Sequence, residues 1–451
     1  MRDPLRVAVV GSGPAGFYAA GALLASAEPR VEVDLIDRLP TPWGLVRLGV
    51  APDHPNIKAV SRAFEKIARQ PGFRFFGNVE LGRDVTHDEL DERYDAVVYA
   101  VGAQTDRQLG VPGEELPGSW PATALVAWYN GHPDFQHLEF DLTHERAVVI
   151  GNGNVALDVA RMLALTPEEL APTDTTDAAI EAINDARVSE IPVVGRRGPV
   201  QAAWTPVEVG ELGELAGADV LVDPAELELD PASAAELESA PPTVRRNLDH
   251  LRDYAARAPA GKQRAIRLRF FASPVAILGD TRVEGIELVR NELVDGRAVA
   301  TGERETIQCG IVFRSVGYRG VALPGVPFDD AAGTVPNERG RVLGRGREKL
   351  PGVYCAGWIK RGPSGVIGTN KKDATETVEL LLEDARSGVL QERSGEDLEQ
   401  LLADRGVVHV LYAGWEAIDA DERGRGEPLG RPRVKLATWD ELLAATRSPD
   451  S

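Results

Sequence analysis

The sequence predicts an α/β protein built from two doubly wound, three-layer domains, one inserted into the other. A strand-length apolar run, a glycine-rich turn, a helical stretch and a second apolar run follow one another near the start of the chain, and the same order recurs near its middle. The length of 451 residues suits two to three domains. We therefore expect two parallel sheets, each covered on both faces.

In the first of these repeats, residues 5–10 predict a buried strand, residues 15–27 a helix, and residues 31–36 a second strand. Gly11, Gly13 and Gly16 of the intervening turn have the G-x-G-x-x-G spacing. These glycines allow a tight turn, close approach of the backbone to a pyrophosphate and close packing of helix on strand.

Asp37 follows the second strand and can accept a hydrogen bond from a ribose hydroxyl. A merely structural glycine turn is the alternative. The strand before the turn, the helix after it and the acid together predict a dinucleotide site.

The second repeat differs from the first at two positions. Residues 146–150 predict a strand, and the turn after it reads Gly151-x-Gly153-x-x-Ala156, with alanine in the third place. After the next strand, where an NAD site has an acid, the chain has Arg196 and Arg197. Two guanidinium groups can bind a 2′-phosphate, which predicts NADP in preference to NAD. The alternative is a solvated arginine pair.

The two repeats are expected to belong to different domains. Residues 94–102 and 311–317 predict apolar strands that each end on a glycine, where the chain can pass from one domain to the other. One dinucleotide site without a group for a 2′-phosphate and one with it imply FAD and NADPH. The expected domains are residues 1–104 and 323–451 for FAD, and residues 105–322 for NADPH. Together they form two Rossmann-like dinucleotide-binding domains, with the NADP domain inserted into the FAD domain.

Composition and charge exclude several classes of protein. The net charge of -20 argues against nonspecific nucleic-acid binding, and no stretch is long and apolar enough to span a membrane. The two cysteines, Cys309 and Cys355, have no Cys or His neighbours in a metal-binding spacing, so we expect no metal site. Strand character begins at Leu5, which leaves no room for a leader and predicts the cytoplasm.

Charge is unevenly distributed along the chain. Residues 205–240 carry only acidic charges, whereas residues 245–269 and 339–372 are predominantly basic. Such blocks are usually solvated faces. The alternative is that the basic blocks bind an acidic partner, through Arg245, Arg246, Arg252 and Arg257 in the first block and Lys360, Arg361, Lys371 and Lys372 in the second.

Motifs spread over most of the chain resemble those of one known family. They lie in residues 11–18, 42–47, 50–55, 77–79, 151–161, 195–199 and 356–368. In these motifs the sequence resembles the adrenodoxin-reductase-like ferredoxin-NADP reductases, in their bacterial form.

The resemblance implies FAD and NADP(H) as cofactors and assigns residues to each. It places FAD against Gly11, Gly13, Ala15, Gly16, Asp37, Leu45, Leu81, Trp358, Gly365, Val366 and Ile367. It places NADPH against Asn152, Gly153, Asn154, Val155, Arg196, Arg197, Glu208 and Gly365. Trp358 could instead be a core aromatic residue.

The resemblance also implies a proton path made of His54, Glu211 and Asp158, because hydride transfer moves protons as well as electrons. The alternative is that His54 only shapes a turn. Three positions depart from the family pattern. Asp37 occupies a position where the family often has Glu, Trp204 replaces a more usual Phe, and Gly210 replaces an Arg.

The implied activity is that of a ferredoxin-NADP reductase. NADPH delivers a hydride to FAD, and an iron-sulfur ferredoxin accepts electrons singly. A disulfide reductase needs a redox-active cysteine pair, and an electron-input subunit with its own iron-sulfur clusters needs many more cysteines. The two isolated cysteines of this chain therefore argue against both functions. An FAD- and NADPH-dependent monooxygenase and a non-catalytic flavin-binding redox sensor remain open. We expect a monomer.

Overall fold

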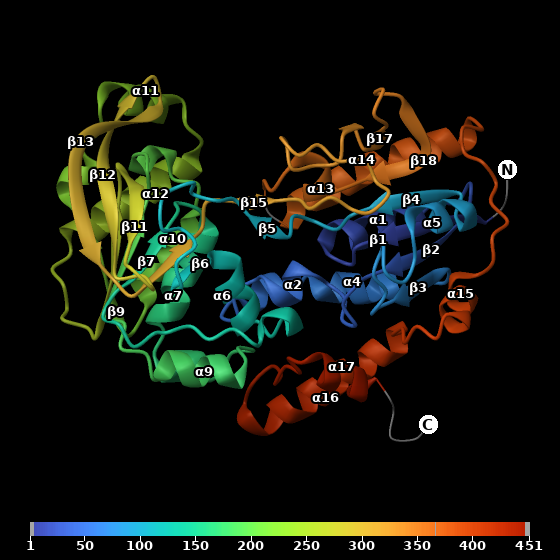
Figure 1. Ribbon diagram of the computed structural model, residues 1–451, viewed down its shortest axis with the longest axis horizontal. Helices are drawn as coiled ribbons and strands as arrows, with labels where there is room; N and C mark the ends of the chain where they lie inside the picture. Colours follow the sequence, from blue (N-terminus) through green and yellow to red (C-terminus); the bar gives the residue numbers. More distant parts are fainter. Residues whose placement is uncertain (1–3, 366, 447–451) are drawn as a thin grey trace. The chain divides into compact units, whose positions relative to one another are not determined.

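The computed structural model describes residues 4–365 and 367–446, which fall into two compact units. Unit 1 combines residues up to Thr105 with Gly317–Pro428 and the residues from Leu436 onward. Unit 2 combines Asp106–Val316 with Leu429–Lys435. Figure 1 shows the elements of both units, which are described separately below. Two short strands, β5 (Thr105–Asp106) and β15 (Tyr318–Arg319), lie where the chain passes between the units.

A seven-stranded sheet forms the centre of unit 1. Its strand order is β16-β17-β18-β4-β1-β2-β3, in which β18 through β3 run parallel and β16 and β17 antiparallel. The strands are β1 (Leu5–Val10), β2 (Val31–Ile36), β3 (Phe73–Phe76), β4 (Ala96–Tyr99), β16 (Asn337–Glu338), β17 (Arg341–Leu343) and β18 (Lys349–Cys355).

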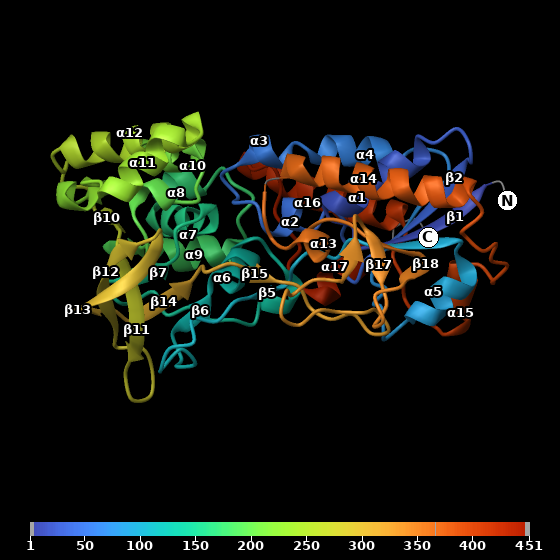
Figure 2. The ribbon, with the colours of Figure 1, turned by 90° about the horizontal axis from the view of Figure 1, so that it is seen from above.

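Side chains of β1 alternate between two cores, which shows that both faces of this sheet are covered. Val7 and Val9 pack with α1 (Pro14–Leu24), α4 (Ser61–Ala68) and α14 (Ile367–Arg386). Ala8 and Val10 pack on the other face, with α5 (His87–Arg93) and α15 (Leu398–Asp404). The three-layer arrangement predicted for the first domain is thus confirmed (Figure 2). The remaining helices of unit 1 are α2 (Leu45–Leu48), α3 (Pro55–Lys58), α13 (Trp358–Arg361), α16 (Tyr412–Gly426), η5 (Glu427–Leu429) and α17 (Trp439–Ala445).

Unit 2 contains a six-stranded, all-parallel sheet. Its order is β6-β14-β7-β8-β10-β9. The strands are β6 (Ser119–Pro121), β7 (Ala147–Ile150), β8 (Glu190–Val194), β9 (Ala218–Val222), β10 (Arg264–Arg269) and β14 (Ile311–Arg314).

The two faces of this sheet are covered by different kinds of layer. Val149 packs in a helical core, whereas Val148 and Ile150 pack against an antiparallel sheet of β11 (Ala272–Leu278), β12 (Gly285–Val294) and β13 (Arg297–Gln308) (Figure 1). The three layers are present, and one of them is a sheet. The helical layer comprises α6 (Ala122–Tyr129), η1 (Pro133–Phe135), α7 (Asn154–Ala164), α8 (Pro167–Leu170), α9 (Asp177–Asn184), η2 (Pro199–Gln201), α10 (Pro206–Glu211), η3 (Leu212–Glu214), η4 (Pro224–Leu227), α11 (Pro231–Ser239) and α12 (Pro242–Ala256).

The segment Leu429–Lys435 lies in unit 2, although the sequence placed it with the FAD domain. Its charged side chains account for this: Arg431 donates to the carbonyl of Thr173 at 3.1 Å and pairs with Asp177, and Lys435 lies 3.2 Å from Asp174. The polar residues 173–176 beside them are buried.

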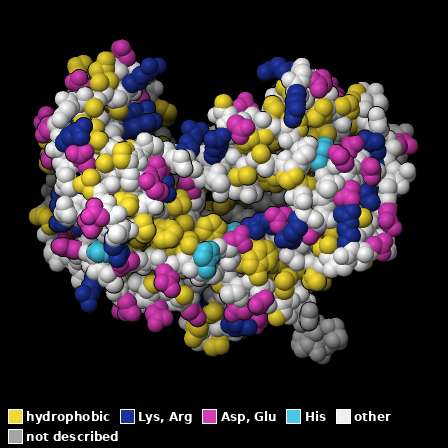
Figure 3. All heavy atoms as spheres, viewed as in Figure 1, with side chains coloured by type: hydrophobic (Ala, Val, Ile, Leu, Met, Phe, Trp, Pro, Cys, Tyr) yellow, Lys and Arg dark blue, Asp and Glu magenta, His cyan; other side chains and the backbone are white. Residues whose placement is uncertain are grey.

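Residues 407–411 are largely apolar, a pattern that favours a strand, but the structure forms only a single bridge there, between Gly77 and Val410. Basic side chains lie among acidic ones on the face shown in Figure 3. Within the described residues, every helix is too short or too polar to cross a membrane.

Candidate functional site

The first glycine-rich turn joins β1 to α1. Gly11 has a φ of 106°, and a Cβ added there would lie 2.6 Å from the carbonyl oxygen of Ala100. A Cβ on Gly16 would lie 1.9 Å from the carbonyl oxygen of Gly11, so the fold itself requires both glycines. A Cβ on Gly13 would meet nothing within 4 Å. Gly13 is the N-cap of α1 and has no capping side chain, which leaves backbone N–H groups available to an anion.

Asp37 is held at the same edge of the sheet by the residue between the first two glycines. The backbone N–H and the hydroxyl of Ser12 donate to Asp37 Oδ2 at 2.7 and 2.6 Å, and the N–H of Leu39 donates to Oδ1 at 2.9 Å. Each carboxylate oxygen has further acceptor capacity, so a ribose hydroxyl can still donate to it. The sequence did not single out Ser12, although its position inside the motif was a signal.

The Trp358 segment lies close to the first turn within unit 1. Gly357 has a φ of 76°, and a Cβ there would lie 2.6 Å from the Cβ of Ala15. Trp358 stacks on Tyr318 with ring centroids 5.4 Å apart, and its Nε1 donates to the carbonyl of Ser364 at 3.2 Å. Trp358 is only partly buried, so it is not simply a core aromatic residue.

The other residues assigned to FAD lie at varying depth. Leu45 is 44 % exposed on α2, directly after Gly44, where a Cβ would lie 2.9 Å from the Cα of Gly13. Leu81 is half-buried, and Ile367 begins α14 behind the exposed Gly365. Val366 lies outside the described residues.

Lys360, expected on a docking surface, is buried. Its Nζ lies 3.1 Å from carboxylate oxygens of Asp373 and Glu376. Asp373 also accepts the N–H of Gly357 at 2.5 Å. Lys360 therefore stabilises the turn before Trp358 and is not available to a partner.

The second glycine-rich turn, in unit 2, repeats the geometry of the first. Gly153 is the N-cap of α7 without a capping side chain, and a Cβ on it would meet nothing within 4 Å. The carbonyl of Asn152 accepts the N–H of Ala203 at 2.8 Å, and Asn154 Oδ1 accepts the N–H of Thr205 at 2.8 Å. These bonds attach the start of α10 to the turn, while Val155 is half-buried beside it.

Arg196 and Arg197 follow β8 at the same sheet edge, because the carboxyl ends of parallel strands meet there. Arg196 is exposed and Arg197 is half-buried. Arg197 Nη2 makes only a long contact, 3.5 Å, with the carbonyl of Gln201. Both guanidinium groups can therefore turn toward a phosphate.

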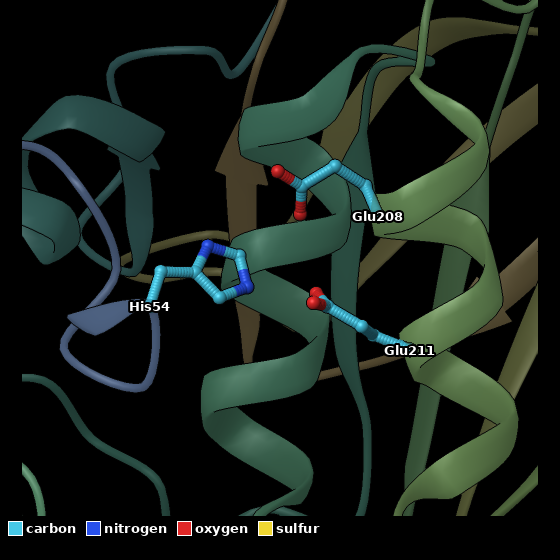
Figure 4. Close-up of side chains that lie close together, drawn as sticks. All are labelled: His54, Glu208 and Glu211. Carbon is cyan, nitrogen blue, oxygen red and sulfur yellow. The ribbon is translucent and has the colours of Figure 1, made fainter. Parts of the chain in front are cut away.

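Three carboxylates of unit 2 surround one arginine that sequence reasoning missed. Arg161 Nη2 lies 2.8 Å from Asp158, and its Nη1 lies 3.2 Å from Glu208 and 3.9 Å from Glu211. Figure 4 shows the two glutamate side chains extending from α10 toward the same side. Arg161 follows Asp158 by three residues and lies on the same helix face, and this spacing was the signal in the sequence that could have revealed it.

Burial raises the pKa of Glu208 to about 8, and the nearby charge of Asp158 adds to this effect. Because the pKa in the folded state lies above the ordinary value of 4.5, the folded protein binds the extra proton. This carboxyl group therefore lowers stability as pH rises from about 4.5 to about 8, and lowers it fully above that range.

We expect Glu208→Gln to remove this pH dependence. Relative to the wild type, its Tm should be unchanged near pH 5 and higher by at least roughly 2–4 °C near pH 9, because a pKa shift of this size corresponds to more than about 1 kcal/mol there. Thermal unfolding at both pH values measures this, with the exposed Glu238→Gln as control. An equal Tm change at both pH values would contradict the prediction.

His54 belongs to unit 1, where it is the N-cap of α3 and is 8 % exposed (Figure 4). Its carbonyl accepts the N–H groups of Ile57 and Lys58, both at 3.2 Å. The backbone of His54 therefore shapes the turn, as one interpretation held. The turn uses backbone atoms of His54, and the proton-path interpretation of its side chain remains a prediction.

Two helix N-termini in this chain, those of α1 and α7, have no side-chain cap and follow a parallel strand. Each has open space at the second glycine of its turn. Together they are typical of a dinucleotide-dependent oxidoreductase. Residues 5–171 match the family model for pyridine nucleotide-disulphide oxidoreductase. The chain is 52 % identical to the NADPH-ferredoxin reductase FprA of Mycobacterium leprae, with 97 % of each covered. It is 44 % identical to the mitochondrial NADPH:adrenodoxin oxidoreductase of Homo sapiens, over 97 % of this chain and 91 % of the relative.

A solved structure of Mycobacterium tuberculosis FprA in complex with NADPH matches with a TM-score of 0.92 and 50 % identity, and covers 98 % of this chain and 99 % of its own. The chain therefore belongs to the family of NADPH-ferredoxin reductases that includes adrenodoxin reductase. It is an oxidoreductase, and the family resemblance and fold class predicted from the sequence are confirmed.

Proposed function

We propose that this protein is an FAD-dependent ferredoxin-NADP reductase, with FAD bound by unit 1 and NADP(H) by unit 2. The observation that carries the proposal is the pair of open turns at Gly13 and Gly153, of which only the second is followed by two arginines. An acid, Asp37, occupies the ribose position of the first site. One site is thus suited to a dinucleotide without a 2′-phosphate and the other to one with it.

When bound, FAD accepts a hydride from NADPH and releases electrons one at a time, which suits a one-electron acceptor. The residues of this chain bind and orient the two dinucleotides. Ser12 and Leu39 hold the carboxylate of Asp37 toward the ribose, and Arg196 and Arg197 bind the 2′-phosphate. The acceptor that we propose is a small iron-sulfur ferredoxin.

Other functions of two-dinucleotide proteins receive less support. Cys309 and Cys355 are both buried and free, and burial raises the pKa of the Cys309 thiol to about 12, which is opposite to what a redox-active thiol needs. A monooxygenase or a non-catalytic flavin-binding sensor would share the cofactors. We propose in addition that the protein is a monomer in the cytoplasm.

The decisive experiment is to record the absorbance spectrum of the purified protein and then supply NADPH with ferredoxin or ferricyanide. We expect a yellow protein with releasable FAD and multiple turnovers with both acceptors. A single turnover would favour a sensor, and NADPH oxidation that requires oxygen and an organic substrate would favour a monooxygenase. Protein that binds no flavin under any condition would overturn the proposal.

The role of His54 is open to a direct test. If His54 handles a proton, as the proposal holds, His54→Ala should lower kcat roughly 100-fold and shift its pH profile. FAD content and the KM for NADPH should stay near those of the wild type, since the turn is made by the backbone of residue 54. Loss of FAD with unchanged turnover per bound flavin would support the turn-shaping interpretation.

A molecule with a net charge of -20 would repel an acidic ferredoxin unless basic side chains are gathered where the ferredoxin docks. We expect this docking surface on α12, because the helix carries several arginines. Arg246 is exposed there, whereas Arg245 donates to the carbonyls of Leu237 and Glu238. Arg246→Glu should slow ferredoxin reduction several-fold at low salt and leave ferricyanide reduction unchanged. Added salt should diminish the difference between this variant and the wild type, since dissolved ions screen the attraction between charges over a Debye length of about 8–10 Å.

The exposed Arg297→Glu on β13 is the matched control, because it makes the same change in net charge at another place. If both variants slow ferredoxin reduction equally, overall charge and not a surface on α12 is responsible. If neither does, α12 is not a docking surface.

A further inference from the structure

The loop that carries Arg196 and Arg197 is attached to the antiparallel sheet of unit 2. The carbonyl of Gly195 accepts the N–H of Ala272, and the carbonyl of Arg197 accepts the N–H of Phe271, both at 3.1 Å. Between these two backbone bonds, the carbonyl of Arg196 accepts the side-chain Nδ2 of Asn291 at 2.8 Å. Three successive carbonyls of the loop are thus held by β11, by β12 and by the residue that precedes β11, and only the middle one depends on the identity of a side chain.

Asn291 is held firmly in this position. It is 5 % exposed, and its own N–H donates to the carbonyl of Phe271 at 2.6 Å. Its Nδ2 also donates to the hydroxyl of Ser273 at 2.8 Å, so both amide hydrogens are used. A peptide carbonyl can only accept, which fixes the amide with its nitrogen toward Arg196.

Asn291 lies beside an irregularity in the pairing of the sheet. The pairing of β12 with β13 shifts register between Val289 and Asn291, where β13 contains two residues more than β12. Ile286 and Leu288 belong to the core on one face of β12, and the alternation of a strand places Asn291 on the other face, with Ser273. A polar side chain that is buried there and has two partners is typical of a position where a side chain must be aimed.

We propose that Asn291 is a positioning residue for coenzyme selection, which fixes the peptide of Arg196 so that Arg196 and Arg197 leave the loop toward the 2′-phosphate of NADPH. This inference rests on the proposed function, in which the two arginines bind that phosphate. Without the amide, the carbonyl of Arg196 loses this donor, and its peptide is held only through the backbone bonds of Gly195 and Arg197. NADH lacks the 2′-phosphate, so its binding should depend less on this peptide.

The test uses the flavin-containing protein with Asn291→Leu, which has a similar volume, no donor and no charge. Calorimetric titration with 2′,5′-ADP and with 5′-ADP reports nucleotide binding independently of turnover. We expect the Kd of 2′,5′-ADP to rise roughly three- to thirtyfold and that of 5′-ADP to change less than twofold. The KM for NADPH should rise to a similar extent, with kcat at saturation unchanged.

Thr301→Val is the matched control, because Thr301 Oγ1 also donates to a backbone carbonyl of this sheet, that of Arg290, but from an exposed position. It should leave both Kd values unchanged. Asn291→Ala serves if the leucine variant does not fold. A Kd for 2′,5′-ADP that stays unchanged, or that rises no more than the Kd for 5′-ADP, overturns the inference.

The double variant Arg196→Ser/Arg197→Ser separates this inference from the proposed function. If the double variant loses its preference for 2′,5′-ADP while Asn291→Leu keeps it, the inference alone fails. If the double variant keeps that preference, the arginines do not bind the phosphate, and both the assignment of the arginines and the inference fail.

Discussion

Gly13→Val is expected to give a folded protein that has lost its flavin. A Cβ at Gly13 meets no atom within 4 Å and the residue has an extended backbone conformation, so the fold has room for a side chain to begin there. The same side chain occupies the space through which a pyrophosphate approaches the N-terminus of α1. We expect the flavin content to fall below about a tenth of the wild-type value, measured by absorbance after gel filtration.

Gly153→Val is the matched change at the second turn, where a Cβ also meets nothing within 4 Å. This variant should remain yellow but should no longer be reduced by NADPH at concentrations that saturate the wild type. The pair of variants therefore assigns one turn to each dinucleotide. Circular dichroism should show the same fold in both.

Gly16→Ala provides the contrasting case, because its Cβ would lie 1.9 Å from the carbonyl oxygen of Gly11. That variant should lose stability as well as flavin. A Gly13→Val protein with full flavin content would show that FAD does not approach this turn. A Gly13→Val protein that instead loses NADPH binding and keeps flavin would reverse the assignment of the two units.

Replacing both Arg196 and Arg197 with serine is expected to raise the KM for NADPH by one to two orders of magnitude or more. Each charge-assisted hydrogen bond to a phosphate contributes roughly 1.5–3 kcal/mol, and a tenfold change corresponds to about 1.4 kcal/mol. NADH lacks the phosphate, so its KM should change little. Steady-state kinetics with both coenzymes measures the difference.

Arg187→Ser is a suitable control, since Arg187 is an exposed arginine that precedes β8 in the same unit. It should affect neither coenzyme. Equal loss of NADPH and NADH activity in the double variant would mean that the arginine pair is structural and that coenzyme choice is made elsewhere.

The sequence by itself determined the parallel strands around the two turns, the turns themselves and the family. Strands and turns are local: an apolar run followed by Gly11-x-Gly13 or Gly151-x-Gly153 specifies a strand that turns into a helix, whatever surrounds it. Asp37, Arg196 and Arg197 were found for the same reason, because each directly follows a strand whose carboxyl end meets the turn.

Only the tertiary structure decided what holds these residues and which charges are available. Lys360 belongs to a basic block of the sequence, but Asp373 and Glu376 bury it, and Arg161 gathers carboxylates from two helices. Asn291 donates to the carbonyl of Arg196, which is 95 residues away in the chain, and the hydrophobic pattern of β12 does not reveal this contact. Hydrogen bonds and ion pairs between residues distant in the chain depend on the packing of whole elements, and the local pattern of the sequence carries no record of them.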